Sequence, residues 1–224
     1  MFRDRTEAGR ALATKLMAYQ EMRPIVLALP RGGVPVGLEI TKALGAPFDL
    51  LFVRKIGVPW QPELAAAAVA DVGGPELVRN EQVIRLANLS ETYLAEEVQR
   101  ESTENARRRQ LYCANRSMPN LADRTVIIVD DGIATGATML AAIHAVRRTK
   151  PARIVVAVPV APPDTLSAVA KEADAVCCLE SPTEFMSISQ FYLSFPQLTD
   201  ADVIELMRRA AALNQGAEKR AGPS

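Results

Sequence analysis

Residues 126–138 read Val126-Ile127-Ile128-Val129-Asp130-Asp131-Gly132-Ile133-Ala134-Thr135-Gly136-Ala137-Thr138. Four aliphatic residues in a row are typical of a strand that is buried on both faces of a parallel sheet. Two carboxylates end the strand, and a turn containing glycine and threonine opens a helix. Ligands of open parallel sheets bind outside the carboxyl ends of the strands. The segment therefore predicts a βα unit with a ligand site at its turn.

The turn has the composition of an anion site. Backbone N–H groups at a helix start attract phosphate, and no large side chain obstructs them at Gly132, Gly136 or Ala137. Thr135 and Thr138 add hydroxyl donors. The turn is neither a Walker P-loop, which needs a Lys after Gly136, nor a G-x-G-x-x-G motif. The alternative is an ordinary βα turn whose glycines only make the bend.

The two adjacent aspartates extend this interpretation. Asp130 and Asp131 would repel each other beside an anion unless they accept hydrogen bonds from hydroxyls or face a cation. A sugar diol or Mg²⁺ would satisfy them, so a phosphate next to a diol suggests a ribose phosphate. Because the acids end a strand at a ligand edge, replacing them is expected to weaken binding and leave the fold intact. Their alternative role is to cap the following helix.

Outward from this unit, aliphatic strands alternate with amphipathic helices, a pattern typical of βαβ units. We therefore predict an α/β fold with a doubly wound, mostly parallel sheet and a small C-terminal flap. The expected strands are 25–29, 49–53, 126–129, 154–159 and 175–179, with weaker strand signals at 66–70 and 76–78, and the expected helices are 5–17, 34–44, 137–148 and 164–172.

The expected domain organisation is a core over 1–180, a hood and terminal helix over 181–213, and a disordered tail over 214–224. The core would carry a helical insertion at about 86–117, in which acids lead and bases trail, as the helix dipole favours.

Composition excludes several classes of protein. The 224 residues carry 26 Lys+Arg and 26 Asp+Glu, so the formal net charge is zero, which argues against nucleic acid as a partner. The three cysteines lack C-x-x-C spacing, which favours a reducing compartment. The amphipathic, charged N-terminus does not resemble a secretory signal, and no apolar run could span a bilayer. We therefore expect a cytoplasmic protein without a membrane partner.

Two more loops follow predicted strands. Leu29-Pro30-Arg31-Gly32-Gly33 follows the first strand, and Val53-Arg54-Lys55-Ile56-Gly57 follows the second and is expected to form a loop. Glycines permit a close approach of backbone to ligand, and the basic side chains suit an anion. The alternatives are a plain Gly-Gly turn and a common surface Arg-Lys pair.

Together, the three loops resemble those of the type I phosphoribosyltransferases, and the chain opening Asp4-Arg5-Thr6-Glu7-Ala8-Gly9 resembles a predicted bacterial group of that family. The resemblance implies that phosphoribosyl pyrophosphate binds with Mg²⁺, which Asp130 and Asp131 hold indirectly through substrate and water. It implies catalytic roles for Lys55, Arg54, Asp130 and Asp131. Ribose 5-phosphate would bind to Asp130, Asp131, Gly132, Ile133, Ala134, Thr135, Gly136, Ala137 and Thr138, and pyrophosphate to Arg31, Gly32, Gly33, Arg54 and Lys55.

One position departs from the oxopurine enzymes of that family, which carry a third acid where this chain has Ala134. The loop is closer to the adenine and orotate types. Glu63 and Glu184 are candidate proton-handling residues, although both are also typical of solvated surface acids. The hood aromatics Phe185, Phe191 and Tyr192 could stack on a flat ring or pack the terminal helix onto the sheet.

The resemblance implies a Mg²⁺-dependent phosphoribosyltransferase, a pentosyl transferase of nucleotide metabolism. It would act on a nitrogen base or related acceptor, as a homodimer. The first alternative is a non-catalytic sensor of the same ligand that regulates RNA or transcription, because fold and ligand loop do not secure chemistry. The retained Arg54-Lys55 pair favours an enzyme.

Overall fold

A computed structural model describes residues 1–114 and 116–221 of the chain, without the side chains of Glu63 and of residues 214–221. Five parallel strands form the main sheet in the order β2-β1-β6-β7-β8. They are β1 (Ile25–Ala28), β2 (Phe48–Leu50), β6 (Thr125–Val129), β7 (Arg153–Val160) and β8 (Ala175–Glu180). The helices that cover this sheet are α1 (Arg5–Leu16), α2 (Gly33–Leu44), α5 (Ala137–Arg148), α6 (Pro163–Glu172) and α7 (Asp200–Ala221).

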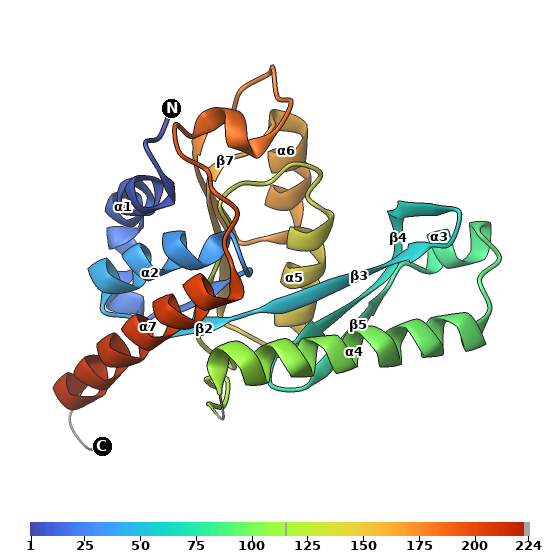
Figure 1. Cartoon of the computed structure of the whole chain (residues 1–224), viewed down its shortest axis with the longest axis horizontal. Helices are drawn as coiled ribbons and strands as arrows, with labels where there is room; N and C mark the ends of the chain where they lie inside the picture. The colour runs from blue at the N-terminus through green and yellow to red at the C-terminus, as the bar shows by residue number, and fades with distance from the viewer. Residues whose placement is uncertain (115, 222–224) are drawn as a thin grey trace.

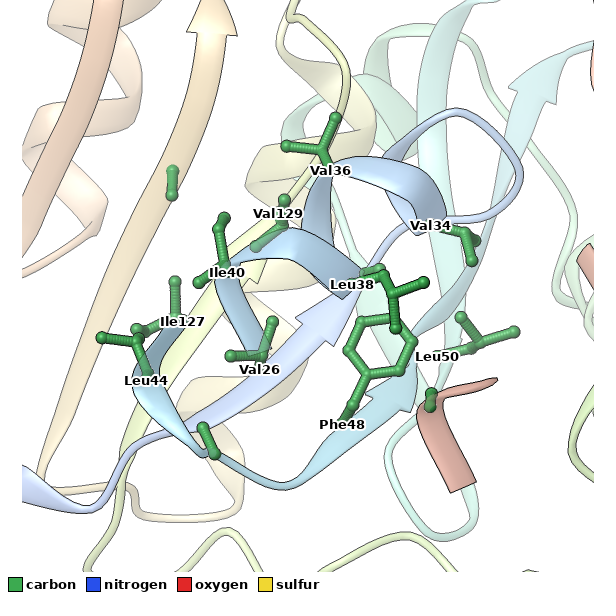
Figure 2. Close-up of a cluster of buried hydrophobic side chains, with 14 of the residues drawn as sticks. Val26, Val34, Val36, Leu38, Ile40, Leu44, Phe48, Leu50, Ile127 and Val129 are labelled. Carbon is green, nitrogen blue, oxygen red and sulfur yellow. The ribbon is translucent and has the colours of Figure 1, made fainter. Parts of the chain in front are cut away.

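Helices bury both faces of this sheet. In β1, Val26 and Ala28 belong to the core formed with α1, α2 and α7, whereas Ile25 and Leu27 belong to the core formed with α5 and α6. Figure 2 shows the first core, where side chains of α2 lie over those of β1, β2 and β6. Burial on both faces explains the unbroken aliphatic runs. The predicted doubly wound α/β sheet is confirmed.

A second sheet begins at Phe52, just after strand β2 of the first sheet. Strands β3 (Phe52–Val58), β4 (Gln61–Asp71) and β5 (Pro75–Arg79) pair antiparallel, and α3 (Glu81–Leu86) and α4 (Glu91–Cys113) follow. Residues 52–113, called the arm below, extend to one side of the parallel sheet (Figure 1). Helix α4 packs on the arm's sheet, which also contacts α5.

The expected loop at Arg54, Lys55 and Gly57 is wrong, because all three residues lie inside β3 and pair with β4. The signal for its partner is weak because Ala65–Ala68 is a run of alanines, which are depleted in strands. Residues 66–68 of this run are buried, and β4 contacts helices α4 and α5. The segment expected as a helical insertion contains α4, which covers these strands.

Arg109 ties the arm to the parallel sheet. Its guanidinium lies 3.2 Å from Asp49 Oδ2, donates to the Leu50 carbonyl at 2.9 Å, and pairs with Asp71 at the end of β4. One cation on α4 therefore joins the last residues of β2 to the arm. This attachment holds the start of β3 beside the carboxyl end of β2.

The segment 181–199, called the flap below, follows β8 and pairs with the N-terminus. Phe2 N donates to Phe191 O and Leu193 N donates to Phe2 O, both at 2.8 Å. After the flap, Thr199 and Asp202 form a capping box at the start of α7. Among the described helices, none combines the length and the apolar character that crossing a membrane requires.

Helix α7 continues into the segment expected as a tail. Its backbone stays helical past residue 214 as far as Ala221, because Ala, Glu, Lys and Arg in this segment favour a helix. Residues 222–224, the rest of the expected tail, lie outside the described residues.

Candidate functional site

The sheet has a topological switch point between β1 and β6. From β1 the chain passes through α2 to β2 on one side, whereas from β6 it passes through α5 to β7 on the other. The loops after β1 and β6 therefore diverge and leave a crevice at the carboxyl edge, where open α/β sheets bind ligands. Two of the three predicted loops lie at this crevice.

These two loops touch. A Cβ placed on Gly32 would lie 2.1 Å from Asp131 Oδ2, and one on Gly33 would lie 2.6 Å from Val129 O. Only glycine permits this approach of α2 to the end of β6. The Pro30–Arg31 peptide bond between β1 and α2 is cis. The structure thus brings together Arg31, Gly32, Gly33 and the acidic pair.

The predicted phosphate loop, residues 132–138, is held by hydrogen bonds to its main chain. Ile133 N donates to Val160 O at 2.9 Å, and Thr165 Oγ1 donates to Ala134 O at 2.8 Å. Gly136 has φ +80°, and α5 starts at Ala137 without a side-chain cap. The first N–H groups of α5 therefore remain for an anion, beside the exposed Thr135.

Asp131 is more constrained than expected for a ligand residue at a strand end. Arg5 Nε donates to its Oδ2 at 2.7 Å, and both side chains are about nine-tenths buried. Tyr192 Oη donates to the Asp131 carbonyl at 2.7 Å. The expectation that replacing both acids leaves the fold intact does not fit this geometry. Loss of the Asp131 carboxylate would leave the buried Arg5 guanidinium without its ion-pair partner.

The Asp130 carboxyl has a pKa that is shifted by its surroundings. Burial, followed by the charge of Asp131, raises the pKa of the Asp130 carboxyl well above its ordinary value. Its Oδ1 accepts a hydrogen bond from the Asp131 N–H at 2.8 Å. The raised pKa means that ionisation of Asp130 is unfavourable, and a hydroxyl donor or a cation next to its carboxyl would offset this cost. The acidic pair is therefore suited to a ligand that carries such groups.

A cavity of about 350 Å³ opens beside the acidic pair. Asp131, Arg31 and Gly32 line it from the sheet edge, and Ile188 and Phe195 line it from the flap. Ile188 also lies over Gly132, where a Cβ would be 2.7 Å from its Cγ2. The flap therefore covers the start of the phosphate loop.

Of the basic residues predicted to bind pyrophosphate, only Arg31 lines this cavity. Its Nη1 lies 3.4 Å from Asp200 Oδ1, which also accepts from Tyr112 Oη at 2.5 Å. Arg54 Nε donates to the buried Glu101 of α4 at 2.6 Å. Lys55 alternates with Arg54 along β3 and so faces the side of the strand opposite Glu101.

The other candidates contribute less. The side chain of Glu63 lies outside the described residues. Glu184 is exposed and does not line the cavity, and Phe185 stacks on Phe191 with ring centroids 5.5 Å apart. Tyr192 is buried against Phe2, with centroids 5.6 Å apart. These aromatics therefore pack within the flap and against the N-terminal segment, rather than packing the terminal helix onto the sheet.

Four residues at the site had no predicted role: Arg5, Tyr192 as a donor to Asp131, Asp200 and Glu101. Arg5 and Tyr192 lie 126 and 61 residues from Asp131. No local pattern reports such distant contacts. The only signal was the position of Arg5 in the quoted N-terminal motif.

The carboxylates fit Mg²⁺ only in a particular way. Within the described part of the chain, no group of three or more His, Cys, Asp or Glu side chains could hold a metal ion. Asp130 and Asp131 provide two carboxylates, of which one already pairs with Arg5. Protein Mg²⁺ sites commonly use one or two carboxylates together with waters and substrate phosphates. The residues therefore fit an ion held largely by its substrate.

Residues 5–195 match the model of the family described as phosphoribosyl transferase domain. Relatives in two strains of Mycobacterium tuberculosis, provisionally named phosphoribosyl transferases, are 41% identical over 210 residues. The match covers 94% of this chain and 47% of each relative, so the chain spans about half the length of these curated relatives. These names give no support to the regulatory alternative.

A solved structure is also similar. The crystal structure of a protein from Thermus thermophilus has 38% sequence identity and a TM-score of 0.81. The likeness covers 93% of this chain and 98% of that one. The parallel sheet, the flap and the arm together therefore make an architecture that a relative shares over nearly its whole length.

Proposed function

The chain belongs to the phosphoribosyl transferase domain family, and we propose that it transfers phosphoribose from phosphoribosyl pyrophosphate to a nitrogen base or related acceptor. Pyrophosphate is released. One observation carries the proposal: the start of α5, the start of α2 and the acidic pair meet at the switch point of a type I fold. This arrangement offers two places for anions with carboxylates between them, as a sugar carrying phosphate groups at both ends requires.

The residues have distinct tasks in this reaction. The phosphate loop binds the 5′-phosphate, and Asp130 and Asp131 orient the ribose hydroxyls. Attack at C1 proceeds with oxocarbenium character, as in other glycosyl transfers. Arg31 and Lys55 stabilise negative charge that grows on the departing pyrophosphate. Arg54 orders the arm through Glu101.

Mg²⁺ would be held by Asp130 and Asp131 through water and by the phosphates of the substrate, where it supplies charge neutralisation of the leaving pyrophosphate. The site works in a cytoplasmic homodimer in this proposal. With Ala134 in place of the third acid, adenine-like or non-purine acceptors are expected to be used better than hypoxanthine and guanine.

The direct test is a screen for pyrophosphate release. The full chain is incubated with labelled phosphoribosyl pyrophosphate, Mg²⁺ and single candidate bases, and ribosylated product is identified by mass. Release that requires one base supports transfer. If no base is used and the chain instead binds a defined RNA with steep salt dependence, the transferase proposal fails. Efficient use of guanine contradicts only the inference from Ala134.

Two substitutions are expected to separate the anion subsites. Thr135→Val removes a hydroxyl donor from the phosphate loop and should weaken ribose 5-phosphate about 10-fold, with pyrophosphate changed little. Arg31→Ala should do the reverse, because Arg31 lies at the start of α2 on the other side of the acidic pair. Calorimetric titration with each ligand measures both affinities. Equal losses of both ligands in both variants would mean that the subsites are misplaced.

A further inference from the structure

The side chain of Arg5 joins three parts of the site. Nε donates to Asp131 Oδ2 at 2.7 Å, and Nη1 donates to the Pro196 carbonyl of the flap at 2.9 Å. The guanidinium carbon lies 3.7 Å from the centroid of the Phe195 ring. Only 9% of the side chain is exposed, so the contacts form with little competition from water. Arg5 lies at the start of α1 and in the lining of the cavity.

We propose that Arg5 is a positioning residue, which orients the Asp131 carboxylate toward the ribose hydroxyls and holds the flap against the same site. The inference rests on the proposed function, in which Asp131 binds ribose. Arg5 fixes Oδ2 of Asp131, which leaves the second carboxylate oxygen for the ligand together with the neighbouring Asp130 carboxyl. The same guanidinium contacts both Asp131 and Phe195, which line the cavity.

The geometry uses properties that only arginine combines. A guanidinium donates in two directions within its plane while its face stacks on an aromatic ring. Lysine has a compact charge and could not hold Asp131, the Pro196 carbonyl and Phe195 together. Tyr192, which donates to the Asp131 carbonyl, supports the flap at the same residue. Flap and ribose site are therefore coupled through one aspartate.

A purely stabilising role makes a different prediction. Breaking the ion pair would then lower the unfolding temperature, but ligand affinities measured far below that temperature would not change. If Arg5 acts by positioning Asp131, replacing Arg5 should weaken ribose 5-phosphate binding only when residue 131 is still an aspartate. A double-mutant cycle tests this dependence.

The experiment measures ribose 5-phosphate and inorganic pyrophosphate binding by calorimetry for wild type, Arg5→Gln, Asp131→Asn and the double variant. We expect Arg5→Gln to weaken ribose 5-phosphate about 10- to 100-fold and pyrophosphate much less. In the Asp131→Asn background, Arg5→Gln should have little further effect. Arg10→Gln is the matched control, because Arg10 is an exposed residue of the same helix that pairs with Glu39 at 3.0 Å.

Arg5→Lys keeps a cation beside Asp131 and provides a second variant if Arg5→Gln does not fold. It should show an intermediate loss of ribose 5-phosphate affinity. If wild type binds ribose 5-phosphate and both Arg5 variants bind it equally well, the positioning role is overturned and the proposed function stands. An equal loss from Arg5→Gln in both backgrounds also overturns it. If wild type binds no ribose 5-phosphate, the proposed function itself fails.

Discussion

Replacement of Asp130 and Asp131 together by asparagine is expected to weaken ribose 5-phosphate binding by about 10²- to 10⁴-fold. Each carboxylate that accepts a hydrogen bond from a sugar hydroxyl contributes about 1.5–3 kcal/mol to the free energy of binding, and this contribution is lost when the carboxylate is replaced. Calorimetric titration of the double variant measures the effect, and Asp164→Asn, an acid in the first turn of α6, serves as control. Unchanged affinity in the double variant would remove the ribose assignment.

The single variants are expected to move stability in opposite directions. The raised pKa of Asp130 means that its ionised form destabilises the folded state. Asp130→Asn should therefore raise the unfolding temperature near pH 7, and the gain should disappear as pH falls below the carboxyl pKa of the unfolded chain, about 3.9. Asp131→Asn should lower stability, by up to about 3–5 kcal/mol, because it leaves Arg5 buried beside a neutral amide.

Thermal unfolding at pH 7 and near pH 4 checks both signs. A residue whose loss stabilises the fold while it abolishes ligand binding is retained for binding, a trade-off typical of functional sites. If Asp130→Asn were neutral for binding and destabilising at pH 7, Asp130 would be a structural residue instead.

The parallel sheet could be predicted closely because its signals are local. The predicted helix over 137–148 coincides with α5, and the predicted strands over 126–129 and 175–179 each fall within a residue of β6 and β8. Strands buried on both faces give continuous aliphatic runs, and the turns between them carry glycine or proline. The location of the candidate site follows from the same pattern, since ligands bind at the carboxyl ends of such strands.

The arm and the contacts of the site could not be predicted in the same way. Residues 54–57 of β3 were expected to form a loop because they follow the predicted strand over 49–53, and the alanines of β4, their partner, give only a weak strand signal. The partners of Arg54 and Arg31 are 47 and 169 residues away. Such pairings depend on tertiary packing. A single sequence reports residue types at the site but not which carboxylate each arginine meets.

Lys55→Ala is expected to reduce turnover about 10²- to 10³-fold while changing affinity for phosphoribosyl pyrophosphate much less. Negative charge on the leaving pyrophosphate grows toward the transition state, so a cation that meets it acts mainly on the rate. Lys55 is tested because it lies on the side of β3 opposite the Arg54–Glu101 pair. Arg54→Ala would mix a catalytic loss with a buried, unpaired carboxylate.

Steady-state rates with a saturating acceptor and calorimetric affinities measure the two effects of Lys55→Ala separately. Lys42→Ala is the matched control, because Lys42 is an exposed lysine on α2 that pairs with Glu39. A parallel fall in kcat/KM and in affinity, with kcat unchanged, would assign Lys55 to ground-state binding. No change in either would place Lys55 outside the reaction and leave Arg31 as the protein cation at the pyrophosphate. The arm would then contribute to the reaction through its structure alone.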